Sequence, residues 1–410
     1  MSDWIQNPDL NRLVQELNDE GASLPGDGAP DAAAPLPAAS IPVRLGGPVE
    51  TQGELADLLS TMVAEKASDL LLVTGRSPLL RIDGSLRKLA GGTVESRALR
   101  EMFEPFLDTR GRRALVERGS ADFSLQLPDA VEGRFPWRFR ANLHRQRGEL
   151  AAAIRALPRE IPSLSELNLP PELAELVRPG HGLVLLCGPT GSGKSSTLAA
   201  LVREIYRHRA CHIVTIEDPV EYDHRSDRGA IEHVEIGRDA PSFAQALRSA
   251  MRQDPDVLLV GEMRDLETIA AAMTAAETGH LVLSTLHSGS AARAVHRIVD
   301  IFPPEQQTQV RVQLAQALRA VVVQHLLPRS GGVGRVPAVE VLQATYAVRQ
   351  LIRGQHPEKL YNEITLGRRQ GMRTLEASLA EWVRTGGVDR EEALLRANHP
   401  QELESLLARR

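Results

Sequence analysis

The stretch GPTGSGKSSTLAAL, residues 188–201, is the most informative part of the chain. Gly188, Gly193, Lys194 and Ser195 fit the pattern G-x-x-x-x-G-K-[ST], with a strand-like apolar run before it and a helix-forming sequence after it. Glycines in such a loop let backbone N–H groups converge on phosphate oxygens, and the N-terminus of the following helix adds a favourable dipole. The stretch therefore predicts a site for a nucleoside triphosphate.

Two side chains of this loop have specific predicted contacts. Lys194 brings a mobile positive charge to the β- and γ-phosphate oxygens, and the Ser195 hydroxyl can ligate Mg²⁺. The residues predicted to bind the nucleotide are Gly188, Pro189, Thr190, Gly191, Ser192, Gly193, Lys194, Ser195 and Ser196.

Strand-like and helix-like segments alternate from residue 182 onward. The apolar runs GLVLLC, HIVTI, DVLLV and HLVLSTL are separated by segments with helical character. This alternation predicts an α/β domain in which helices cover both faces of a parallel sheet. After about residue 303 we expect helices to the end, apart from a glycine-rich turn at RSGGVGR, residues 329–335.

Carboxylates follow two of the predicted strands. Glu217, Asp218 and Glu221 come after HIVTI, and Glu262 comes after DVLLV and Gly261. A parallel sheet binds its ligand at the carboxyl ends of its strands. We therefore predict that Glu262 orients or deprotonates the attacking water. Glu221, together with Asp218, is predicted to hold magnesium, and Glu221 also to help position the water.

Two histidines bracket the next predicted strand. His287 follows it at the ligand end and is suited to sensing the γ-phosphate. His280 precedes it, and seven residues of strand separate the two by roughly 20 Å, which excludes a shared metal ion. For His280 a capping or core role and a functional role both remain open.

The N-terminal part of the chain changes character three times. Residues 8–20 carry four aliphatic side chains on one helical stripe, so residues 1–20 are either a docking helix or a frayed terminus. In residues 21–50, 18 of 30 are Ala, Pro or Gly, which predicts a disordered linker. A mixed α+β module then spans residues 51–160, and a proline-punctuated connector spans 161–178.

Composition excludes several classes of protein. The net charge of −5 argues against a surface built for direct nucleic-acid binding. Two cysteines cannot form a disulfide framework or a four-cysteine zinc site. No apolar run approaches the ~18–20 residues of a membrane span, and the first ten residues do not have the pattern of a secretory signal. We therefore expect a cytoplasmic protein without membrane insertion.

Several longer motifs resemble one family. These are GPTGSGKSSTLAA, IEDPVEY, LRSAMRQDPDVLLVGEMRDLETI, TAAETGHLVLSTLH and RIVDIFPPEQQ. Together they are similar to the hexameric ATPases of the secretion superfamily, and within it to the PilT/PilU-type ATPases that retract type IV pili. The resemblance extends from about residue 53 to the end.

The resemblance implies an architecture and a role. It implies a PAS-like N-terminal domain over residues 51–160, a RecA-like ATPase domain over 179–345 and a C-terminal helical region over 346–410. The expected activity is hydrolysis of ATP with Mg²⁺ in a homohexameric ring, coupled to pilus disassembly and twitching motility. The expected partners are the inner-membrane pilus platform protein and a sister PilT/PilU ATPase, at the cytoplasmic base of the pilus machine.

Arginines are concentrated between Arg134 and Arg159, where seven of them accompany a single acid, Glu149. Composition alone leaves a nucleic-acid groove or a solvated face open. The resemblance instead places Arg140 and Arg155 across a domain or subunit interface, where they reach the triphosphate. A guanidinium there stabilises transition-state charge, an effect worth about 10³–10⁵ in rate.

Departures from the family pattern keep alternatives open. The absence of a four-cysteine metal element favours the retraction branch, and AVRQLIRG, residues 347–354, partly matches the retraction signature AIRNLIRE. The segment EEALLRANHPQEL, residues 391–403, looks more like PilU than PilT. The alternatives are a type II secretion or DNA-uptake ATPase, and an accessory subunit that modulates a sister motor.

Overall fold

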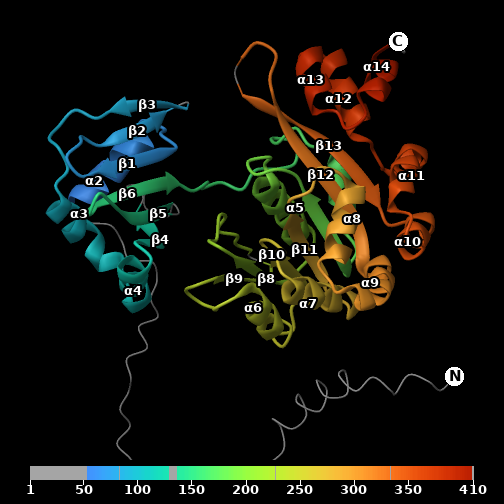
Figure 1. The fold of residues 1–410 in the computed structure, drawn as a ribbon, viewed down its shortest axis with the longest axis horizontal. Coiled ribbons are helices and arrows are strands. Elements are labelled where there is room, and N and C mark those ends of the chain that lie inside the picture. Colours follow the sequence, from blue (N-terminus) through green and yellow to red (C-terminus); the bar gives the residue numbers. More distant parts are fainter. Residues whose placement is uncertain (1–52, 83, 129–135, 227, 333, 409–410) are drawn as a thin grey trace, which may run out of the picture. The chain divides into compact units, whose positions relative to one another are not determined.

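The computed structural model describes residues 53–82, 84–128, 136–226, 228–332 and 334–408 (Figure 1). The predicted docking helix, residues 1–20, and the predicted linker, residues 21–50, lie outside the described residues.

The first domain is built on a six-stranded antiparallel sheet. Its strand order is β3-β2-β1-β6-β5-β4. Leu59 of the first helix and Phe103 of the second are buried against sheet residues such as Phe139, in one apolar core. The elements are α2 (Gly53–Ala64), β1 (Asp69–Val73), β2 (Leu79–Ile82), β3 (Ser85–Lys88), α3 (Ser96–Phe103), η1 (Glu104–Phe106), α4 (Thr109–Glu117), β4 (Ser120–Leu127), β5 (Trp137–Gln146) and β6 (Glu149–Ala156).

The second domain contains a seven-stranded sheet in the order β13-β12-β7-β11-β10-β8-β9. All neighbouring strands are parallel except β13, which pairs with β12 in antiparallel fashion at one edge. The strands are β7 (Gly182–Cys187), β8 (His212–Glu217), β9 (Ala230–Glu235), β10 (Val257–Val260), β11 (Leu281–Leu286), β12 (Leu318–Pro328) and β13 (Arg335–Gln343). The predicted α/β class, with a mixed N-terminal domain and a RecA-like domain, is confirmed.

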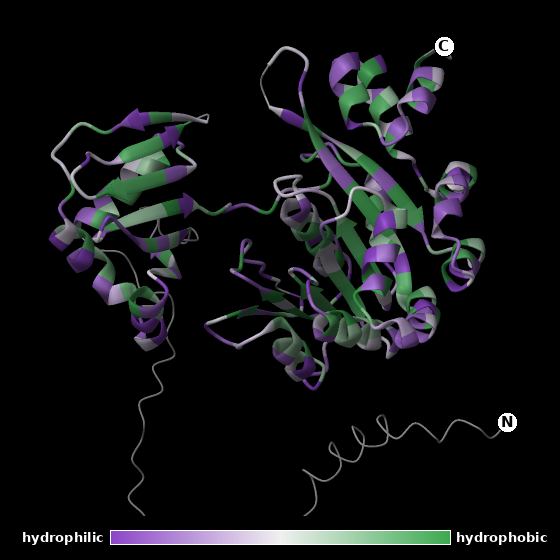
Figure 2. Cartoon of the chain, viewed as in Figure 1, coloured by the Kyte–Doolittle hydropathy of each residue, from purple (hydrophilic) through white to green (hydrophobic). Residues whose placement is uncertain are grey.

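Helices cover both faces of this sheet. The face that includes Val184 and Leu186 packs against α5 (Lys194–His208) and the connector helix η2 (Pro171–Leu176). The opposite face, which includes Leu183 and Leu185, packs against several helices. These are α6 (Phe243–Ala250), α7 (Leu266–Glu277), α8 (Ala291–Asp300), α9 (Pro304–Ala317), α10 (Tyr346–Arg353) and α11 (Leu360–Leu366). Because both faces are covered, the central strands β7 and β11 are buried along their whole length and are mostly apolar (Figure 2).

The expectation of helices alone after residue 303 is wrong. Residues 318–328 and 335–343 are the strands β12 and β13, and the glycine-rich turn joins them into a hairpin. Three consecutive valines, Val321 to Val323, favour a strand because β-branched side chains restrict χ1. A strand buried on both faces lacks alternation, so its pattern resembles that of a buried helix.

The chain ends in short helices beyond this hairpin. They include η3 (Pro357–Lys359), η4 (Gly367–Gln370), α12 (Leu375–Arg384), α13 (Arg390–Arg396) and α14 (Pro400–Ala408). Leu375, Leu379 and Leu403 pack with Leu327 of β12 in a separate small core. None of the helices within the described ranges is both long and apolar enough to cross a bilayer.

Candidate nucleotide site

The phosphate-binding loop connects the carboxyl end of β7 to the N-terminus of α5, as its sequence predicts. Gly188 has φ +142° and Gly193, the N-cap of α5, has φ +86°. Both values are disfavoured for residues with a side chain. The tip of the loop, Pro189 to Gly191, is exposed, while Ser195 and Ser196 are half-buried. The loop therefore presents its backbone toward solvent, where a phosphate can approach.

Lys194 lies beneath this loop and is only 9% exposed. Its Nζ donates to the carbonyl oxygens of Gly188, at 3.0 Å, and of Pro189, at 2.8 Å. Burial lowers the pKa of Lys194, while Cys187, Glu262 and Glu221 act in the opposite direction. The structure therefore brings Lys194 into the electrostatic range of both predicted catalytic carboxylates.

Glu262 and His287 follow two adjacent parallel strands, β10 and β11, and so meet at one edge of the sheet. The Glu262 Oε2 atom lies 3.9 Å from His287 Nε2, and its Oε1 lies 2.6 Å from Arg264 Nε. Burial lowers the pKa of His287, Lys194 lowers it further, and Glu262 opposes the shift. Glu262 and His287 thus lie beside each other, and both interact electrostatically with Lys194.

Glu217 is the last residue of β8, the strand next to β10, and Asp218 and Glu221 follow that strand. The Glu221 N–H donates to Glu217 Oε2 at 3.3 Å, which fixes the start of this loop. Burial raises the pKa of Glu217 to about 7, although the Thr215 hydroxyl and the Glu221 N–H both stabilise its ionised form. Asp218 is exposed. Glu217 therefore anchors residues 218–221, here called the carboxylate loop, and the charge of Glu221 favours the ionised form of Lys194.

The residues proposed to hold magnesium fit the chemistry of that ion. Among the residues that the structure describes, no group of three His, Cys, Asp or Glu side chains forms a metal cage. Mg²⁺ needs none, because it binds through one or two carboxylates, water and substrate phosphates. Ser195 stands at the N-terminus of α5, and Glu221 and Asp218 stand at the carboxyl end of β8. Oxygen donors from two sides of the loop suit this cation.

The two arginines predicted to reach the triphosphate make contacts within the first sheet of their own chain. Arg155 donates to Asp69 Oδ1 at 2.8 Å, and Arg140 lies 3.6 Å from Asp122. Both guanidinium groups are largely exposed. A role on the nucleotide of a neighbouring subunit therefore stays a prediction for both residues.

Arg138, another arginine of the segment between Arg134 and Arg159, contacts the carboxylate loop instead. Its Nη2 donates to the carbonyl oxygen of Val220 at 2.6 Å. Burial lowers the pKa of Arg138, while Asp223, Glu235 and Glu217 counteract that shift. This guanidinium links β5 of the first domain to the residue directly before Glu221.

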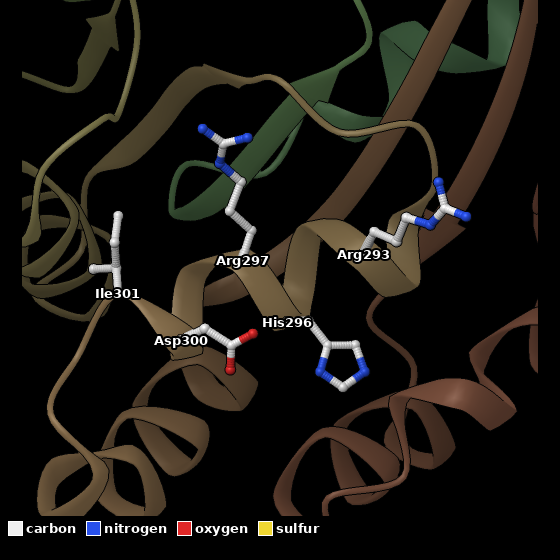
Figure 3. Close-up of a pocket in the computed structure, with 5 residues that line it drawn as sticks. All are labelled: Arg293, His296, Arg297, Asp300 and Ile301. Atoms are coloured by element: carbon white, nitrogen blue, oxygen red, sulfur yellow. The ribbon is translucent and has the colours of Figure 1, made fainter.

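Sequence analysis missed three residues that support the site. Gln324 of β12 contacts the phosphate-binding loop, and the Tyr222 hydroxyl lies 2.8 Å from Ser196 Oγ. Arg297 projects from α8 with Arg293 and His296 (Figure 3), and its Nη1 donates to the His287 carbonyl at 2.8 Å. A single glutamine inside the apolar run AVVVQHLLP is a detectable signal, but the pattern of the run also fits a buried helix.

His280 lies at the other end of β11 from His287. Its Nδ1 is 3.0 Å from the carbonyl oxygen of Ala275, and its backbone N–H donates to the same oxygen. His280 therefore caps the carboxyl end of α7, which supports the structural interpretation of this residue.

Comparison with known proteins places this site in a family. Residues 151–395 match the family described as Type II/IV secretion system protein. The chain is 39% identical over 348 residues to "Type IV pilus retractation ATPase PilT" of Pseudomonas aeruginosa, which covers 85% of this chain and 99% of that protein. It is 39% identical over 349 residues to "Twitching motility protein" of Neisseria gonorrhoeae, covering 85% of this chain and 92% of that protein.

A solved structure agrees with these sequence matches. The crystal structure of the pilus retraction motor PilT with bound ADP has a TM-score of 0.78 and 40% identity, covering 86% of this chain and 100% of that one. The chain therefore belongs to the Type II/IV secretion system protein family, among its PilT-type members.

Proposed function

We propose that the protein is an ATP-hydrolysing motor that powers retraction of type IV pili. The observation that carries this proposal is the cluster of Lys194, Glu221, Glu262 and His287 at the carboxyl ends of neighbouring strands. It occurs in a chain that aligns with nearly the whole length of a PilT protein. A retraction motor needs a hydrolytic centre and residues that sense whether ATP has been hydrolysed, and the proposal assigns both tasks to this cluster.

In the proposed mechanism each residue of the cluster has one task. The loop amides and Lys194 bind the β- and γ-phosphates, and the Ser195 hydroxyl, Glu221 and Asp218 hold Mg²⁺. Magnesium, when bound, neutralises charge on the phosphate oxygens during transfer. Glu262 orients the attacking water and accepts its proton, which requires that Arg264 leave the carboxylate.

The remaining tasks fall to residues that sense the γ-phosphate. His287, whose carbonyl oxygen accepts a hydrogen bond from Arg297, contacts that group in this proposal and reports its loss. Arg140 and Arg155 act from another domain or subunit, so that hydrolysis depends on how the modules are oriented.

Assembly follows from the same proposal. We infer a homohexameric ring at the cytoplasmic face of the inner membrane, at the base of the pilus machine. There it acts on the platform protein, with a sister PilT/PilU ATPase as a further partner. Deleting the gene tests this directly, because cells that lose retraction are expected to carry more pili and to stop twitching. Normal piliation and motility would refute a role in retraction.

A further inference from the structure

Gln324 of β12 is buried at 3% exposure and makes two hydrogen bonds to the nucleotide region. Its Nε2 donates to the carbonyl oxygen of Ser192, within the phosphate-binding loop, at 2.8 Å. Its Oε1 accepts from the Thr197 hydroxyl, in the first turn of α5, at 2.8 Å. One side chain therefore ties the loop and the helix after it to a neighbouring strand.

Gln324 also leaves no room for a side chain at two glycines of the loop motif, Gly188 and Gly193. A Cβ atom on Gly188 would lie 2.3 Å from the backbone carbonyl oxygen of Gln324. A Cβ atom on Gly193 would lie 2.8 Å from Gln324 Nε2. Gly191, at the exposed tip, has no atom within 4 Å of such a Cβ. The loop is thus packed against Gln324 at both ends and free only at its tip.

Thr197 completes this arrangement. Its hydroxyl, besides donating to Gln324, lies 3.1 Å from the carbonyl oxygen of Gly193. The Gln324 side-chain N–H donates to a backbone carbonyl oxygen, and the Thr197 hydroxyl donates to a side-chain oxygen. Phosphate is bound by backbone N–H groups, so neither hydrogen bond occupies a group that the phosphate needs. These contacts are compatible with a bound nucleotide.

We propose that Gln324 is a positioning residue that fixes the phosphate-binding loop in its binding conformation and thereby sets nucleotide affinity. The inference rests on the proposed function, because it assumes that the loop binds ATP and ADP. Fixing a loop beforehand removes the entropy cost of ordering it when the ligand arrives. Once phosphate is bound, its own contacts with the loop hold the same conformation.

Two predictions separate this role from simple support of the sheet. Without Gln324 the dissociation constant for nucleotide rises, whereas kcat at saturating ATP changes little. A residue that only supports the sheet would lower the melting temperature and leave affinity unchanged well below that temperature.

The experiment compares full-length variants by calorimetric titration with Mg-ADP, steady-state ATP hydrolysis and thermal melting. Gln324→Leu removes both hydrogen bonds, and Thr197→Val removes one, while Thr197→Ser keeps the hydroxyl. Ser378→Ala is the matched control, since it removes a buried hydrogen bond to Val339 of β13 far along the chain from the loop.

We expect Gln324→Leu to bind Mg-ADP about tenfold more weakly, with kcat within about twofold of the wild type. Thr197→Val should show a smaller loss and Thr197→Ser none. Ser378→Ala should melt earlier but bind normally. The double variant Gln324→Leu/Thr197→Val should bind about as weakly as Gln324→Leu alone, because without Gln324 the Thr197 hydroxyl keeps only its contact with the Gly193 carbonyl oxygen.

Unchanged affinity in Gln324→Leu, with a wild type that binds Mg-ADP, overturns the inference and leaves the proposed function intact. A wild type that binds neither Mg-ADP nor Mg-ATP overturns the proposed function itself. If Gln324→Leu does not fold, equal affinities of Thr197→Val and Thr197→Ser overturn the inference instead.

Discussion

Lys194 carries a positive charge that is buried beneath the phosphate-binding loop. The side chain is nine-tenths buried, and its ammonium group donates hydrogen bonds to two backbone carbonyl oxygens in place of water. Burial lowers its pKa, and the carboxylates of Glu262 and Glu221 favour the charged form. A phosphate adds further negative charge at the same place, so nucleotide binding and the charge of Lys194 support one another.

Replacing this residue should separate binding from folding. We expect Lys194→Ala to weaken nucleotide binding and to abolish ATP turnover, because the β- and γ-phosphates lose their cation. Titration with Mg-ATP and a turnover assay check this. Turnover at the wild-type rate in Lys194→Ala would show that the loop is not the catalytic phosphate site.

Glu340 of β13 is a buried carboxyl outside the nucleotide site. It is 2% exposed and accepts a hydrogen bond from the Ala291 N–H, at the start of α8, at 2.7 Å. Burial raises its pKa from 4.5 to about 7. The folded chain therefore holds one more proton than the unfolded chain between these pH values, so the free energy of unfolding falls as pH rises from 4.5 to 7.

Glu340→Gln should remove this dependence. Glutamine accepts the same hydrogen bond and never ionises, so the variant is expected to be more stable than the wild type by about 1–3 kcal/mol at pH 8. Near pH 4.5 the two proteins should be similarly stable. Urea denaturation at both pH values measures the difference, and equal stabilities at pH 8 would contradict the assignment.

Helix α7 begins at a clear cap directly after the Glu262 segment. Asp265 accepts from the Thr268 N–H and from its hydroxyl, both at 2.8 Å. Asp265→Ala should cost about 1 kcal/mol of folding stability, because a helix N–H loses its acceptor. Asp265→Asn keeps an acceptor and should lose less. Thermal melting compares the two, and identical melting points would exclude the capping role.

Elements with a strong local pattern could be predicted from the sequence. The strands β7, β8, β10 and β11 are short apolar runs between helices, and the loop motif fixes the order around β7. The hairpin β12–β13 could not be recognised in the same way, because β12 begins at Leu318 directly after α9 ends at Ala317, and its 11 residues are long enough for a helix. Nor was β9 predicted, since its alternating burial lies in a polar segment, AIEHVE.

The site residues that could be predicted are those whose positions follow from the residues next to them in the sequence. Lys194 and Ser195 belong to one contiguous motif, His287 follows β11 directly, and Glu262 follows β10 after one glycine. Gln324 is separated from Ser192 by 132 residues, so only the pairing of β12 with β7 brings them together. Long-range contacts of this kind depend on sheet order, which the local pattern does not contain.

At the scale of the whole molecule, the central question is whether a neighbouring subunit completes each site. Arg155 is 70% exposed in its own chain and pairs with Asp69 there. We expect Arg155→Ala to keep nucleotide affinity within a few fold while slowing hydrolysis strongly, because the guanidinium stabilises transition-state charge only.

Mixing two inactive variants tests whether Arg155 acts across subunits. A ring of Arg155→Ala and Lys194→Ala chains contains interfaces at which an intact Lys194 meets an intact Arg155. Part of the turnover should therefore return on mixing, and each variant alone should stay inactive. Normal hydrolysis by Arg155→Ala alone would exclude this assignment.

The most direct test of the proposed mechanism compares ATP binding and ATP turnover in the wild type and in Glu262→Gln. If Glu262 activates the water, the variant should bind Mg-ATP as tightly as the wild type and lose nearly all turnover. A Glu262→Gln protein that hydrolyses ATP at the wild-type rate would contradict the central claim that this carboxylate drives the motor.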